Sequence, residues 1–132
     1  MKKVAFYNSK GGTGVTSKTI EFANSLKKQN VDSMIVFKEH DDFFPSSTLG
    51  NSISYSKYKE NENQHDDKVI VFDLSGLFRG KNEASQNILK DCDYVVRVDN
   101  GYAKELNEVD YQTICELDLL DVDSREALEL LT

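Results

Sequence analysis

The sequence lacks tryptophan, has a single proline, and only two of its 132 residues are cysteine. Cys92 and Cys115 are far apart and show no metal-ligand spacing, so the sequence predicts neither a disulfide framework nor a zinc site. No apolar run approaches the roughly 20 residues that a membrane-spanning helix needs. The apolar run near the N-terminus is also too short for a signal peptide. We therefore expect a cytoplasmic protein that does not enter a membrane.

The chain also has fewer basic than acidic residues. The chain carries 16 basic and 23 acidic residues, a formal net charge of −7. This balance speaks against a general DNA-binding surface, because phosphate neutralisation dominates affinity for DNA. The excess is uneven, since residues 1–65 carry 9 basic and 7 acidic residues whereas residues 66–132 carry 7 and 16. We expect any anion site in the N-terminal half and a solvated acidic surface in the other half.

A glycine-rich stretch lies between an apolar run at residues 4–7 and a helical pattern that starts near Thr16. Glycines let the backbone turn its N–H groups toward an anion, and the N-terminus of a helix adds a partial positive charge. The order strand, glycine loop, helix therefore predicts a phosphate-binding loop. Its expected binding residues are Gly11, Gly12, Thr13, Gly14, Val15, Thr16 and Ser17.

This loop resembles the deviant phosphate-binding loop of the ParA/MinD family of ATPases, which reads Lys-Gly-Gly-x-Gly-Lys-Thr-Thr/Ser. Residues 10–17 match the pattern except at Val15, where the family places the lysine that neutralises the β- and γ-phosphates. In this respect the chain is similar to the TadZ/CpaE and BcsQ proteins, which carry a small uncharged residue there. The resemblance implies ATP and Mg²⁺ as ligands, and a homodimer in which Lys10 reaches the partner subunit's nucleotide. It also implies weak or absent hydrolysis.

A second alignment of a phosphate-loop pattern to this stretch is also possible. Residues 12–19 resemble the general phosphate-binding loop with Ser17 in place of its second glycine. Lys18 follows Val15 by three positions, so on a helix it lies on the same face one turn on. Lys18 either returns part of the missing positive charge or is an ordinary solvated helix lysine.

The apolar run at residues 69–72 is followed by Asp73 and Gly76. This pattern predicts a buried strand with an acid at its carboxyl end, the edge at which open α/β sheets bind ligands. It resembles the Walker B and switch segment of the same family. The resemblance implies that Asp73 supports Mg²⁺ through a bound water and that Thr16 supplies a hydroxyl ligand. The alternative is that Asp73 only caps the strand end.

The family pattern fails after the second apolar run, at residues 33–37. Lys38 and His40 stand where the family carries two aspartates, one of which helps to orient the attacking water. Residues 39–42 are predicted to form a solvated loop, with a shifted water-orienting acid or a metal site as alternatives.

The rest of the chain predicts the outline of one domain over residues 1–132. Residues 43–68 are expected to form a mobile loop or switch region, with a short strand or helical turn near residues 53–58. We expect a compact, Rossmann-like α/β domain of the P-loop NTPase type, with about four mainly parallel strands flanked by helices. Relative to the family it is either minimal or truncated. Further patterns predict helices at residues 82–89, 102–117 and 123–131 and a strand at residues 94–99.

Two functions follow from these patterns. The first is a ParA/MinD-like ATP-binding switch that positions a plasmid, a chromosome locus or a cellular machine, with the dimer as signalling state. The second is a degenerate interaction protein that keeps the fold without nucleotide. Lys10, the glycines, Thr16 and Asp73 favour the first, whereas Val15 and the acidic second half favour the other. No segment matches the adenine-contacting part of the family, and the protein partner is not predicted.

Overall fold

A computed structural model describes residues 2–8, 14–37, 52–74, 83–98, 115–117 and 120–132. In this part of the chain one parallel sheet has five strands in the order β3-β2-β4-β1-β5. The strands are β1 (Lys2–Tyr7), β2 (Ser33–Phe37), β3 (Ser52–Ser54), β4 (Val69–Leu74) and β5 (Tyr94–Arg97). The expected α/β class is confirmed, with one more strand than the sequence predicted.

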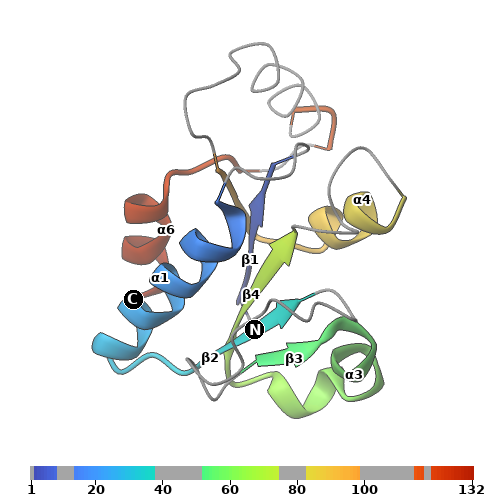
Figure 1. Cartoon of the computed structure of the whole chain (residues 1–132), viewed down its shortest axis with the longest axis horizontal. Coiled ribbons are helices and arrows are strands. Elements are labelled where there is room, and N and C mark those ends of the chain that lie inside the picture. The colour runs from blue at the N-terminus through green and yellow to red at the C-terminus, as the bar shows by residue number, and fades with distance from the viewer. Residues whose placement is uncertain (1, 9–13, 38–51, 75–82, 99–114, 118–119) are drawn as a thin grey trace.

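Helices cover both faces of the sheet (Figure 1). Successive side chains of a strand point to opposite faces, so Phe6 packs on one side of the sheet and Tyr7 on the other. The central strands β1 and β4 are buried on both sides, which explains their nearly continuous apolar sequences. On the Phe6 side lie α1 (Val15–Lys28) and α6 (Ser124–Leu131), and on the Tyr7 side lie α3 (Tyr55–Glu60) and α4 (Glu83–Lys90).

The segment expected to form a loop has regular structure over most of its described residues. Within residues 52–68, β3 is followed directly by α3 and then by the 3-10 helix η1 (Glu62–His65). Tyr58 anchors α3, because its ring is 1% exposed and meets Phe72 of β4 edge-on with 5.7 Å between ring centroids. Burial of one large aromatic ring therefore holds a polar segment against the sheet.

The final helix forms as its sequence predicts. Asp123 is the N-cap of α6, and its carboxylate accepts a hydrogen bond of 2.7 Å from the backbone N–H of Glu126. Such a cap satisfies one of the free donors at the start of a helix. The helix expected at residues 102–117 lies outside the described residues except for its last three positions.

A buried lysine ties the start of β1 to the turn between α4 and β5. Lys3 is 9% exposed, its ammonium group donates to the carboxylate of Asp91, and its backbone N–H donates to Asp93 at 2.8 Å. Burial alone lowers the pKa of Lys3, but the hydrogen bond to Asp91 and nearby negative charges outweigh it, so the pKa is raised. Lys3 therefore stays charged at the amino edge of the sheet.

Tyr58 gives a test of the packing of α3. By geometry its hydroxyl is buried without a hydrogen-bond partner in the described part of the chain, and the ammonium group of Lys3 is its charged neighbour. An unsatisfied buried polar group destabilises the fold, so Tyr58→Phe should raise the free energy of unfolding by about 1 kcal/mol. Urea denaturation measures the change, with the half-buried Tyr94 changed to Phe as the control. A loss of stability in Tyr58→Phe would show that the hydroxyl is bonded.

Candidate functional site

The two informative stretches of sequence meet at the carboxyl edge of the sheet. β1 and β4 are neighbours, and Phe6 lies opposite Asp73 while Tyr7 lies opposite Leu74. The helix after β1 packs on one face and the helix after β4 packs on the other. Connections that leave adjacent strands toward opposite faces open a crevice at the strand ends, where α/β proteins of this type bind ligands.

One hydrogen bond joins the glycine-loop region to β4. The hydroxyl of Thr16, in the first turn of α1, donates to Oδ2 of Asp73 at 2.8 Å, across 57 positions of sequence. Asp73 is 1% exposed. A carboxylate removed from water in this way has to be held by hydrogen-bond donors. Asp73 is therefore bonded toward the start of α1 instead of capping its strand in solvent.

Gly14 sets the start of α1. It is the N-cap, with φ 88° and ψ 22°, a left-handed conformation that side chains disfavour. The backbone N–H of Lys18 donates to the Gly14 carbonyl at 3.0 Å and begins the helical bonding. The N–H groups of residues 15–17 precede that bond, and no acidic residue lies in the first turn. This end of α1 therefore presents positive backbone charge toward the crevice.

Val15 is used for packing. It is 4% exposed and belongs to the same buried cluster as Phe6 and Phe22. A charged side chain at this depth would lose its hydration. The position that carries the phosphate lysine in the family pattern is thus part of the core between α1 and the sheet.

Asn8 is a site residue that the sequence analysis missed. It is 4% exposed, and its Nδ2 donates to the Val98 carbonyl, while the Val98 N–H donates to the Tyr7 carbonyl at 2.9 Å. These bonds hold the point where β1 leaves the sheet for the glycine loop. The sequence could have indicated this role, because a polar side chain directly after a buried strand needs hydrogen-bond partners if it is buried too.

Several predicted residues cannot be placed. Lys10, Gly11, Gly12 and Thr13 lie outside the described residues, as do residues 38–51 and Gly76. The structure brings together Gly14, Thr16 and Asp73, and it leaves the side chain of Ser17 exposed on α1.

The oxygen atoms of Thr16 and Asp73 are suitable ligands for a hard cation. Among the described residues there is no cluster of three or more His, Cys, Asp or Glu side chains that could hold a metal. Mg²⁺ does not need one, because proteins usually hold it by one or two carboxylates together with water and substrate phosphates. The hydroxyl of Thr16 and the carboxylate of Asp73 fit that ligand set.

Comparison with known proteins adds no family assignment. No protein-family model and no curated protein sequence matches this chain. In the described parts of the chain, no helix has both the length and the apolar content to cross a bilayer. The resemblance to the ParA/MinD family therefore stays a prediction from motifs.

Gly14 can be tested through its backbone alone. A Cβ built at this position meets no atom within 4 Å, so substitution adds no clash. Gly14→Ala should still lower the free energy of unfolding by about 1–2 kcal/mol, because the left-handed conformation is strained for alanine. Gly14→Asn should cost less, since asparagine tolerates that region. Equal denaturation midpoints for wild type and Gly14→Ala would contradict the left-handed N-cap.

The bond between Thr16 and Asp73 can be tested with two substitutions. Thr16→Val removes a donor from a buried carboxylate and should lower the free energy of unfolding by about 1–3 kcal/mol. Thr16→Ser keeps the hydroxyl and should stay closer to wild type. Chemical denaturation of the three proteins gives the comparison, and a valine variant as stable as the serine variant would contradict the bond.

Proposed function

We propose that this protein binds ATP with magnesium at the carboxyl edge of its sheet and acts as a ParA/MinD-like switch. The observation that carries the proposal is the hydrogen bond from Thr16 to Asp73. It brings together, at the N-terminus of a helix, the hydroxyl and the carboxylate that a magnesium-bound phosphate group requires. These groups come from two separate motifs of the sequence.

Each described residue of the site has a role in this proposal. The N–H groups of the first turn of α1 bind phosphate oxygens, and Gly14 lets the chain turn into the helix close to the ligand. Thr16 and Asp73 hold the cation, and Mg²⁺ supplies neutralisation of phosphate charge when bound. Asn8 fixes the start of the loop through its bond to Val98.

The proposed activity is binding with weak or absent hydrolysis. Phosphoryl transfer depends on positive charge placed around the developing negative charge. Val15 lies in the core where the family pattern has a lysine, and Lys38 stands at the position of an expected aspartate. We propose that the output is dimerisation in the cytoplasm, with Lys10 contacting the nucleotide of the partner subunit, and that the dimer positions a plasmid, chromosome locus or cellular machine.

A second candidate is an interaction protein that does not bind nucleotide. The burial of Val15 supports this candidate. A protein that no longer binds phosphate needs no lysine at this position, so an apolar residue can pack there instead. In that case the bond between Thr16 and Asp73 only stabilises the fold.

Titration separates the two candidates. Calorimetry with Mg·ATP and with Mg·ADP, alongside light scattering, should show saturable ATP binding and a doubled mass for the wild type. Thr16→Val should lose most of the ATP affinity because it removes a cation ligand. Thr19→Val is the matched control, since the Thr19 hydroxyl bonds to Val15 O of its own helix at 2.8 Å. Absence of heat from wild type at millimolar nucleotide would contradict the proposed function.

A further inference from the structure

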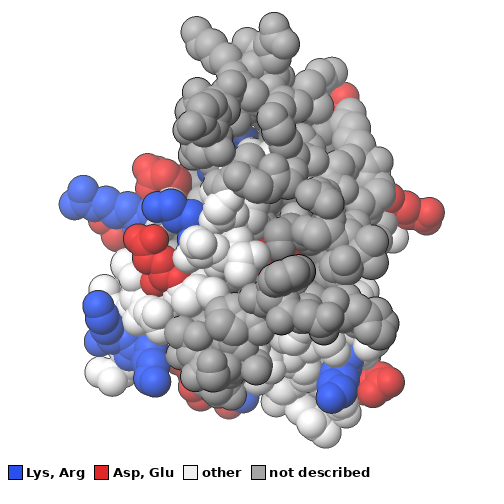
Figure 2. Space-filling view, in the orientation of Figure 1, with Lys and Arg blue, Asp and Glu red and all other residues white. Residues whose placement is uncertain are grey.

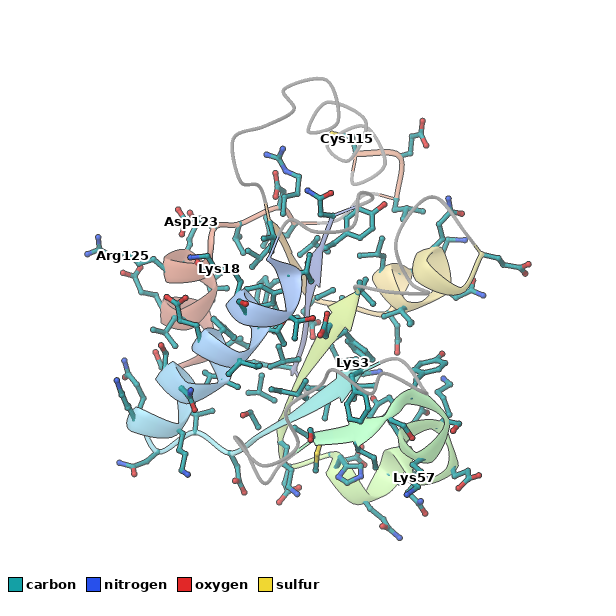
Figure 3. All side chains as sticks on the ribbon, in the orientation of Figure 1. Lys3, Lys18, Lys57, Cys115, Asp123 and Arg125 are labelled. Atoms are coloured by element: carbon teal, nitrogen blue, oxygen red, sulfur yellow. The ribbon has the colours of Figure 1, made fainter. Side chains whose placement is uncertain are left out.

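Lys18 lies on the side of α1 that faces the start of α6 (Figure 3). A cavity of about 120 Å³ there is lined by Lys18 and Ser124, by the apolar side chains of Phe6 and Val98, and by the acidic Asp123. A second cavity of about 220 Å³ runs on between α1 and α6 and is also lined by Lys18 and Ser124. The lysine side chain therefore has open space on both sides.

The cations around these cavities differ in how firmly they are held. Both Nε and Nη2 of Arg97 lie 2.9 Å from Oδ2 of Asp121, so this guanidinium group is engaged. Arg125 is 91% exposed and extends away from the fold (Figure 3). Among the described residues Lys18 pairs with Glu21, which is exposed, at 3.6 Å. Exposed ion pairs of this kind contribute about 0–1 kcal/mol, so Lys18 can leave Glu21 at little cost.

Lys18 is close enough to the N-terminus of α1 to act there. Its backbone N–H bonds to Gly14, which places it one turn above the N-cap. Side chains on a helix tilt toward the N-terminus. The four residues from Gly14 to Lys18 rise about 6 Å along the helix, a distance comparable to the reach of an extended lysine side chain with its four-carbon stem.

Charges of both signs are mixed on the described surface around Lys18 (Figure 2). Figure 2 shows acidic and basic side chains interspersed along the outer side of α1 and α6, without a large basic patch among the described residues of that view. Mixed surfaces of this kind produce little long-range attraction for anions. A cation that binds phosphate here has to act by direct contact.

We propose that Lys18 supplies the positive charge that Val15 does not, by contacting the phosphates of a nucleotide bound at the N-terminus of α1. This inference rests on the proposed function and adds a residue that the ParA/MinD pattern does not contain. The side chain leaves Glu21, turns through the space beside Ser124 and reaches back toward Gly14. The ammonium group of Lys18 thus contacts the phosphates from the second turn of the helix, while Val15 stays in the core.

Affinity measurements on Lys18 variants test this inference. Lys18→Ala should weaken binding of Mg·ATP and of inorganic triphosphate by about 10-fold, the effect of losing a hydrogen bond to a charged group. Lys18→Arg should keep most of the affinity. Lys27→Ala is the matched control, because it removes an exposed lysine from the last turn of the same helix and should change affinity less than twofold. Raised salt should narrow the difference between wild type and Lys18→Ala.

The outcomes distinguish this inference from the proposed function. Wild-type affinity in Lys18→Ala, together with loss of binding in Thr16→Val, would overturn the role of Lys18 and leave the nucleotide site standing. Equal weakening by Lys18→Ala and Lys27→Ala would overturn it too, because the effect would then be one of net charge. Absence of ATP binding in wild type would overturn both. Circular dichroism confirms that each variant is folded.

Discussion

The buried carboxylate of Asp73 is the constraint on which the carboxyl edge of the sheet depends. An acid that is 1% exposed requires donors, and Thr16 reaches it only if α1 starts directly beside β4. That start depends on the left-handed turn at Gly14. On the other side of β1, the bond from Asn8 to Val98 joins the end of β1 to the end of β5. The same bonds that stabilise the fold also bring the N-terminus of α1 to the carboxyl edge of the sheet.

Local patterns in the sequence predicted much of this arrangement. The apolar runs of β1 and β4, the acid at residue 73 and the cap of α6 are visible because each depends on neighbours in sequence. The pair formed by β3 and α3 was visible only as a short strand or helical turn near residues 53–58, since Tyr58 becomes a core residue only through contact with Phe72. Similarly, the burial of Val15 depends on how α1 lies on the sheet, and no local pattern records it.

The two proposed functions differ in how they interpret the same contacts. A hydroxyl bonded to a buried carboxylate is a preorganised cation site if phosphate binds beside it, and an interior hydrogen bond if it does not. Charge is what separates the cases, because a triphosphate needs more than backbone N–H groups to be held tightly. Lys18 is the described cation that combines an exposed, weakly held partner with proximity to Gly14.

The burial of Val15 also bears on how this loop can change over time. A single substitution to lysine would place an ammonium group in the cluster around Phe22, where it loses hydration. Such a change becomes neutral only after neighbouring core residues have made room for a path to the surface. A change to lysine at this position is therefore coupled to the packing of the whole helix.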